Sequence, residues 1–319
     1  MARVVYYVHG RGRGHASRAV WLAQAALEAG HQVRLRAGDQ ALDLLATRFP
    51  VERIRSIRRG APGVVDFPAR LREEVRILRE FSPDLVVSDG DAPALAAARW
   101  LGLPAVAIGH DLVFSRCRLP PLPWRPLLSC RSTAWMASAT RRAIAVHFLP
   151  VEPLDSGVAV ARPVTPPPRE VPTDGAGAVV AYFRDANGQR ILSALERLGA
   201  PLLAFGQGAR GFDGAAFPAY LQGASAVVSS AGSNVLAECV LLEKPVLALH
   251  RRDDHEQALN ALLIERSGAG MRATFEEVTV ATLETFWRRV RSGDFRKIPL
   301  AQRLPDLVSA FQKHALAGL

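Results

Sequence analysis

Short runs of β-branched and aromatic residues alternate with longer amphipathic stretches, and this alternation starts again halfway along the chain. In the first round, residues 3–8 read as a strand, 16–29 as a helix and 31–37 as a second strand. Strand, helix and strand in this order imply a parallel sheet, because parallel neighbours need a crossover connection. The sequence therefore predicts α/β structure with two Rossmann-like halves.

A proline-rich stretch, ARPVTPPPREVPTD at 161–174, lies between the two rounds and is the clearest boundary in the chain. We expect an N-terminal Rossmann-like domain over residues 1–160, a linker over 161–175 and a second Rossmann-like domain over 176–303. The remaining elements are expected as helices at 40–48, 69–81, 92–101, 188–198, 217–222, 234–242, 279–291 and 304–316, and as strands at 84–88, 104–108, 178–183, 201–205, 226–229 and 245–249.

Residues 116–147 fit neither pattern, since they mix arginine, proline and tryptophan and contain no acidic residue. Two interpretations remain open for them. One is a mobile loop bordering an acceptor site, followed by a helix near 129–143. The other is an irregular helix packed on the sheet.

Composition narrows the class of protein. The 319 residues carry a net charge of +10, which favours anionic partners such as nucleotide diphosphates, acidic membrane surfaces or nucleic acid. Apolar runs stay short of a membrane span, and the N-terminus reads as a strand and not as a signal peptide, so we expect a cytoplasmic protein. The three cysteines, Cys117, Cys130 and Cys239, show no pairing pattern of a disulfide framework or zinc site.

One stretch of the second half is suited to bind a phosphate. After the strand at 226–229 comes a turn of small residues, Ala231-Gly232-Ser233-Asn234, and then a helix. Free N–H groups and the positive end of the dipole at a helix N-terminus favour an anion. Glu238 lies one turn into this helix, where it can accept hydrogen bonds from ribose hydroxyls. A charged loop then offers hydrogen-bonding groups for a sugar, at His255, Glu256, Gln257 and Asn260. Many α/β proteins have a similar turn without a ligand.

A glycine loop ends in a histidine after the first strand, with Gly10, Gly12, Gly14 and His15. The run does not match the dinucleotide fingerprint, because position 15 is not glycine and no acidic residue follows at the required distance. A histidine at a helix N-terminus tends to stay neutral and to accept a proton. The alternative is a histidine that only caps the helix or binds the acceptor.

Polar side chains follow the neighbouring strands of the first half. Asp89 and Asp91 come after the strand at 84–88, and His110 and Asp111 after the strand at 104–108. These should emerge at the same sheet edge as His15, where Asp89 is best placed to orient the imidazole. The Asp89-Gly90-Asp91 triplet has the form of a metal-binding motif but lies away from the phosphate turn, and we expect no metal. In the second half, Arg184 and Gly206 follow strands on the edge of the phosphate turn. Arg184 could pair with a diphosphate or be an ordinary surface residue.

The run Ala231-Gly232-Ser233-Asn234, Glu238, Glu256-Gln257 and Asn260, together with the loop ending in His15, resembles GT-B glycosyltransferases of the MurG and family 1 types. The resemblance spans most of the chain. It implies two Rossmann-like domains facing a central cleft, with the acceptor bound by residues 1–160 and the nucleotide-sugar donor by 176–303. It also implies that residues 304–319 form a helix returning to the first domain. His15 would be the general base, and Gly12, Gly14, Asp91, His110 and Asp111 would border the acceptor.

The resemblance implies transfer of a sugar from a UDP- or dTDP-sugar to a hydroxyl or amine, with inversion and without a metal. Two other readings stay open. A nucleotide-sugar hydrolase or 2-epimerase has similar loops. A non-catalytic nucleotide or nucleic-acid binder could use the positive charge, although no nucleic-acid-binding motif is present and we expect no such partner. The basic segment 116–147 could provide peripheral membrane contact. The acceptor is a small molecule or lipid that the sequence does not identify.

Overall fold

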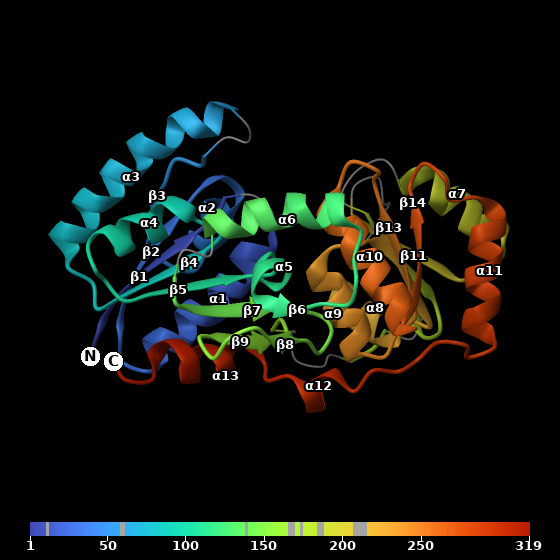
Figure 1. Ribbon diagram of the computed structural model, residues 1–319. Helices are drawn as coiled ribbons and strands as arrows, with labels where there is room; N and C mark the ends of the chain where they lie inside the picture. Colours follow the sequence, from blue (N-terminus) through green and yellow to red (C-terminus); the bar gives the residue numbers. More distant parts are fainter. Residues whose placement is uncertain are drawn as a thin grey trace. The chain divides into compact units, whose positions relative to one another are not determined.

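The computed structural model describes residues 1–10, 13–57, 61–137, 140–164, 170–172, 175–183, 188–206 and 216–319, without the side chains of residues 13, 61–65 and 135–137. The chain divides into two compact units. The first comprises residues 1–121, 128–164 and 304–319, and the second comprises residues 122–127 and 165–303. Figure 1 gives the course of the chain.

The first unit is built on a parallel sheet with the strand order β3-β2-β1-β4-β5-β7-β9. Its strands are β1 (Arg3–Val8), β2 (Gln32–Ala37), β3 (Val51–Arg53), β4 (Leu85–Asp89), β5 (Ala105–Gly109), β7 (Arg142–Val146) and β9 (Val158–Ala161). A short antiparallel pair, β6 (Cys117–Arg118) and β8 (Glu152–Pro153), is separate from it. The central position of β1 and β4 places their carboxyl ends side by side.

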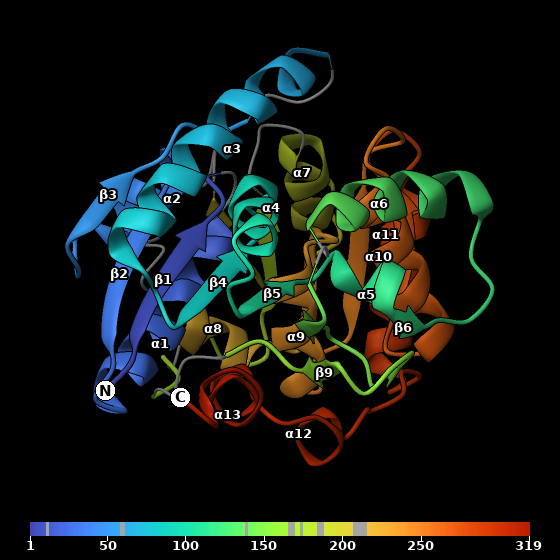
Figure 2. The ribbon, with the colours of Figure 1, turned by 60° about the vertical axis from the view of Figure 1, so that its left-hand side comes forward.

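Helices cover both faces of this sheet (Figure 2). They are α1 (Arg13–Glu28), α2 (Asp39–Leu45), α3 (Ala61–Phe81), α4 (Ala92–Trp100) and α5 (Leu112–Arg116). Helix α6 (Trp124–Ala137) begins in the second unit and continues in the first. Alternate residues of β1 feed two cores: Tyr6 packs on the α1 side, and Tyr7 packs on the α3 and α4 side. Because strand side chains alternate between faces, this single strand links both helical layers.

Residues from the end of the sequence complete the first unit. Helix α13 (Leu307–Phe311) continues into a π-helical turn over Gln312–Leu316 and packs against α1 and β9. Leu307 and Phe311 are fully buried in the same core as Tyr6. The backbone N–H of Arg162 donates to the carbonyl of Pro305 at 2.9 Å, which fixes where the returning chain joins β9.

The second unit has its own parallel sheet, in the order β11-β10-β12-β13-β14. The strands are β10 (Val179–Phe183), β11 (Leu202–Gly206), β12 (Ala226–Ser230), β13 (Val246–His250) and β14 (Gly270–Thr274). The helices are α7 (Gln189–Arg197), α8 (Phe217–Gly223), α9 (Ser233–Leu241), α10 (His255–Ser267), α11 (Val280–Arg291) and α12 (Leu300–Arg303). Separate apolar clusters fill the two faces of this sheet.

The expected α/β class is confirmed, but three local predictions are wrong. The helix expected near 129–143 is α6, which ends at Ala137, and β7 begins at Arg142. The charged loop expected after β13 is the start of α10, because Asp254 caps the helix by accepting from Gln257 N–H at 3.0 Å. Strands β3, β6, β7, β8, β9 and β14 were not expected. No helix in the described ranges is long and apolar enough to cross a membrane.

Candidate active site

His15 and Asp89 meet at the carboxyl edge of the first sheet. Asp89 ends β4, and His15 lies in the first turn of α1, which follows β1. Nδ1 of His15 is 2.6 Å from Oδ1 of Asp89. The carboxylate is fully buried, whereas 27% of the histidine side chain is exposed. The imidazole therefore contacts the buried carboxylate on one side and remains accessible to a substrate on the other.

The contact defines which nitrogen of His15 carries the proton. Burial alone would raise the Asp89 pKa, but Arg18 and His15 outweigh it and hold that pKa below its usual value. The carboxylate is thus ionised and can only accept a hydrogen bond. At 2.6 Å, Nδ1 of His15 must be the donor. In the neutral ring this leaves Nε2 as the acceptor, which is the form that a general base requires.

Arg18 is the residue of this site that sequence reasoning missed. It lies one turn after His15 on α1, and its Nε and Nη2 donate to the two oxygens of Asp89 at 2.5 and 2.6 Å. Nη2 also lies 2.9 Å from Nδ1 of His15. The spacing His-x-x-Arg on one helix face was the available signal, because residues three apart on a helix are neighbours.

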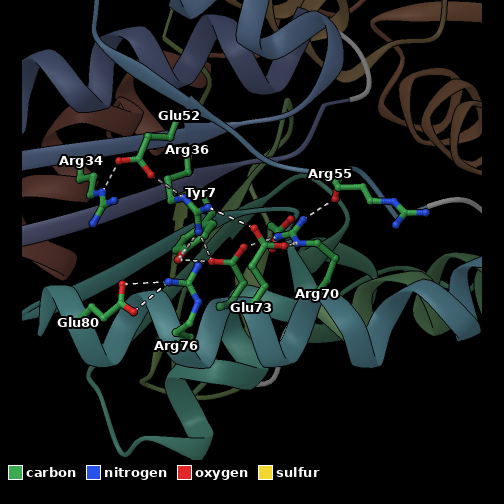
Figure 3. Close-up of polar contacts among 11 residues, drawn as sticks. Tyr7, Arg34, Arg36, Glu52, Arg55, Arg70, Glu73, Arg76 and Glu80 are labelled. Carbon is green, nitrogen blue, oxygen red and sulfur yellow. Dashed lines mark hydrogen bonds and ion pairs between the residues drawn. The ribbon is translucent and has the colours of Figure 1, made fainter.

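Asp91 belongs to a different network on the opposite face of the sheet. It is buried, caps α4 by accepting from Ala94 N–H at 3.0 Å, and pairs with Arg70 at 3.4 Å. Glu74 accepts from Tyr7 Oη at 2.6 Å and also binds Arg36 and Arg70. Figure 3 shows how Tyr7, Arg36 and Arg70 converge beneath α3. Asp91 was expected to border the acceptor, and its carboxylate is engaged in the interior by Arg70 and the α4 N-terminus.

His110 is also interior. Only 5% of it is exposed, its Nδ1 lies 2.9 Å from the carbonyl oxygen of Val146, and its ring stacks on His147. The ring of His110, which was expected to border the acceptor, is thus enclosed in the first unit. Asp111 is partly buried and precedes α5. His147 was not predicted, and both of its ring nitrogens are buried without a hydrogen-bond partner.

The glycines of the first loop are only partly described. Gly14 is half-buried in the first turn of α1, and Gly12 lies outside the described residues. Gly90, between Asp89 and Asp91, has φ +80°. His9 directly follows β1, and its ring meets that of His15 edge to face, with 5.7 Å between the centroids.

In the second unit, the turn after β12 leaves a helix N-terminus open. Gly232 is the N-cap of α9, and no side chain caps the helix. The N–H of Ala231 donates to Leu249 and that of Gly232 to Ser230, so the open N–H groups begin at Ser233 and Asn234. Asn260 is fully buried and donates to the carbonyl of Ala231 at 3.1 Å. Asn260, expected to bind a sugar, thus secures the turn through this hydrogen bond.

Glu238 lies on α9 and points to no partner among the described residues. Burial raises its pKa to about 7. A carboxyl group in such surroundings gains strongly from hydroxyl donors, which would satisfy its ionised form.

The other candidate donor residues lie around this edge. His255 and Glu256 are exposed and Gln257 is half-buried, all in the first turn of α10. Gly206 ends β11 with φ +98°, and a Cβ there would collide with the carbonyl of Phe183, so only glycine fits. Arg184 lies outside the described residues.

Two hollows lie elsewhere on the units. One of about 670 Å³ runs along the outer face of α3 to Trp100, and one of about 340 Å³ is lined by Arg190, Arg251, Phe275 and Glu276. None of the candidate site residues lines either hollow. In the described part of the chain, no group of three or more His, Cys, Asp and Glu side chains is placed to hold a metal ion.

Both halves of the sequence match glycosyltransferase families. Residues 12–147 match the model described as Glycosyltransferase Family 4, and residues 186–291 match the model described as Glycosyl transferase family 1. An uncharacterized glycosyltransferase of Methanosarcina acetivorans is 28% identical over 124 residues, which is 34% of this chain and 32% of that protein. A second, from Methanosarcina mazei, is 27% identical over 124 residues, covering 34% of this chain and 33% of that protein. The chain thus matches about a third of the length of these curated relatives.

Solved structures share the fold over nearly the whole chain. MurG of Acinetobacter baumannii superposes with a TM-score of 0.68 at 16% identity, covering 98% of this chain and 100% of that one. The glycosyltransferase VinC, in complex with dTDP, gives 0.68 at 15% identity and covers 98% of each chain. The two parallel sheets and these superpositions define the GT-B class. The chain shares the GT-B fold with these glycosyltransferases, and each of its halves matches a glycosyltransferase family model.

Proposed function

We propose that the protein transfers a sugar from a nucleotide-diphosphate sugar to a hydroxyl or amine of an acceptor. Glu238 is the observation that carries the donor assignment. Its carboxyl group has no protein partner among the described residues, sits just over one turn into an uncapped helix and has a pKa raised to about 7 by burial. A nucleoside diphosphate supplies both missing partners, a phosphate for the open N–H groups and ribose hydroxyls for the carboxylate.

The chemistry assigned to the first unit is general-base catalysis. Nε2 of His15 takes the proton of the acceptor as the acceptor oxygen or nitrogen attacks the anomeric carbon. The bond from that carbon to the diphosphate breaks, and the electron pair leaves on the nucleotide. The α9 N-terminus favours the charge that grows on the leaving diphosphate. One displacement of this kind inverts the anomeric centre.

We propose UDP or dTDP as the nucleotide. The VinC neighbour was solved with dTDP, and a related rhamnosyltransferase was solved with its spinosyn aglycone. These likenesses concern the fold, and here they only guide the choice of compounds. We also propose that no metal takes part, because the helix N-terminus offers a fixed positive potential to the diphosphate. Unchanged turnover in EDTA is the expected result, and loss restored by Mg²⁺ would refute this part.

The central experiment is a thermal-shift and calorimetric screen against UDP, dTDP, GDP, ADP and their sugars. A ligand at a hundred times its dissociation constant should stabilise the protein by about 2.7 kcal/mol. Product analysis by NMR then separates the activities. A glycoside formed only with acceptor supports transfer, free sugar without acceptor indicates a hydrolase, and a C2 epimer indicates an epimerase. Lack of binding by every nucleotide would refute the donor site.

Peripheral membrane contact through residues 116–147 is a further part of this proposal. The side chains of Trp124 and Leu128 on α6 are 68% and 61% exposed beside Arg125, the combination that suits an anionic membrane interface. Co-sedimentation with phosphatidylglycerol vesicles should exceed that with phosphatidylcholine vesicles and should fall in a Trp124→Ala/Leu128→Ala variant. Equal sedimentation of both proteins would exclude this segment.

A further inference from the structure

Arg18 makes close polar contacts to both Asp89 and His15. Only 6% of Arg18 is exposed, and its guanidinium group binds both oxygens of Asp89. Oδ1 of Asp89 is shared, since it receives Nη2 of Arg18 at 2.6 Å and Nδ1 of His15 at 2.6 Å. The guanidinium fork is planar and rigid, so it fixes the carboxylate plane, and the carboxylate plane fixes the direction of Nδ1–H.

The same contacts set the local charge. Burial lowers and Asp89 raises the pKa of Arg18, with a net rise, so the group is a cation at every pH of interest. The charges of Arg18 and Asp89 cancel, so the net charge of the site is zero before His15 takes up a proton. An aspartate without the arginine would favour the imidazolium form, whereas here a positive charge 2.9 Å from Nδ1 opposes it.

The remaining polar groups around His15 come from three elements. Tyr6 on β1 is buried and interacts with Asp89 and Arg18, and His9 after β1 touches the His15 ring. The charge of Asp111, after β5, also acts on Arg18 and raises its pKa. Within the described residues, Arg18 is the one arginine or lysine that binds Asp89.

We propose that Arg18 is a positioning residue of the general base, which aligns Asp89 with His15 and offsets the charge of Asp89. The base is a three-residue unit, His15, Arg18 and Asp89, in which the arginine acts through the aspartate. This inference rests on the proposed function for its catalytic meaning, while its charge effect is independent of turnover.

Two variants separate the parts of this role. Arg18→Gln removes the charge, and Arg18→Lys keeps it but cannot bind both oxygens of Asp89 in the same way. With donor and acceptor, Arg18→Gln should lower kcat by tenfold or more, leave the donor KM within about twofold, and move the acid limb of the pH–rate profile up by about one pH unit. Arg18→Lys should lower kcat because lysine cannot hold the carboxylate of Asp89 in the same orientation. The acid limb of its pH–rate profile should stay at the wild-type pH, because the charge is kept. Arg48→Gln, an exposed arginine of the same unit, is the matched charge control.

The ¹⁵N NMR signals of the His15 ring, assigned by their loss in His15→Gln, give a readout that does not need activity. The His15 signal should titrate at higher pH in Arg18→Gln than in wild type and Arg48→Gln. If Arg18→Gln titrates like wild type, or changes only the donor KM, the inference is overturned. If the wild-type protein shows no turnover while the NMR shift is observed, the proposed function fails and the role of Arg18 in charge offset stands.

Discussion

A Cβ on Gly90 would lie 3.2 Å from Cε1 of His15, so this glycine and the candidate base are in direct contact. The same Cβ would lie 3.1 Å from Cβ of His9, and the backbone has φ +80°. The residue between the two aspartates is therefore part of the wall behind the imidazole.

We predict that Gly90→Ala lowers both stability and turnover. A left-handed alanine costs about 1–2 kcal/mol, and the crowded methyl group must displace the His15 ring. Gly30→Ala is the matched control, because Gly30 has φ +81° with nothing within 4 Å of the added carbon. Chemical denaturation and kcat should show a larger loss at Gly90. Equal effects of the two substitutions would show that the contact with His15 has no catalytic weight.

His15→Ala should reduce turnover a hundredfold or more, the loss expected for a positioned general base, while donor affinity stays nearly unchanged. Asp89→Asn should also lose turnover. It should in addition destabilise the first unit by about 3–5 kcal/mol, because it leaves the buried Arg18 cation without its carboxylate. Kinetics and denaturation of both variants check this. Loss of donor binding in His15→Ala would make the histidine a donor ligand.

Glu238→Gln should have opposite effects on stability and binding. The folded-state pKa near 7 exceeds the ordinary 4.5, so the folded protein binds the extra proton and loses stability as pH rises between these values. Neutral glutamine removes this cost, and we expect a gain of about 1–2 kcal/mol at pH 8 and little at pH 4.5. Nucleotide affinity should fall by about 1.5–3 kcal/mol. Calorimetry that finds unchanged affinity would remove Glu238 from the donor site.

His147→Leu should make the first unit more resistant to acid. Burial and then His110 lower the pKa of His147 far below its ordinary value, so below about pH 6.5 the unfolded chain takes up a proton that the folded chain refuses. The free energy of unfolding of the wild-type protein must therefore fall as the pH drops below about 6.5. The variant should lose less stability between pH 7 and pH 5, by about 2 kcal/mol. An unchanged pH dependence in urea titrations would assign the acid sensitivity to other groups.

Glu74→Gln should be among the most destabilising single changes in the first unit. Glu74 is fully buried between Tyr7, Arg36 and Arg70, and its loss leaves two interior guanidinium groups without their shared carboxylate. The expected cost is about 3–5 kcal/mol. Glu80→Gln breaks the exposed pair with Arg76 on the same helix and should cost less than about 1 kcal/mol. Similar costs for both would contradict a buried network that supports α3.

The sequence was most informative where the spacing of apolar residues and the direction of the strands decide the structure. From the strand pattern of β1 and the glycine loop after it, we predicted correctly that His15 lies beside the end of β4, because the carboxyl ends of parallel strands meet at one edge of the sheet. The strand pattern did not predict on which face of the sheet each polar side chain after a strand would lie. Asp89 and Asp91 are two residues apart, yet Gly90 in a left-handed conformation sends one to α1 and the other to α3.

Charge patterns misled the prediction in two places. The run from His250 to Asn260 is dense in polar residues and suggested a loop, but Asp254 caps a helix there and Asn260 points into the interior. Arg18 was not singled out in the sequence. Its spacing from His15 is a local signal, but its partner Asp89 lies 71 residues away, and no local pattern predicts that contact.

The return of residues 304–319 to the first unit has a consequence for synthesis. Leu307 and Phe311 fill a core begun by β1, so the ribosome must make the entire second unit before the first can close. During synthesis, the apolar surface of α1 that these residues cover therefore stays exposed. Exposed apolar surfaces of this kind favour aggregation or chaperone binding. A polypeptide ending at residue 164 should remain a chaperone client, and adding residues 304–319 as a separate peptide should release it.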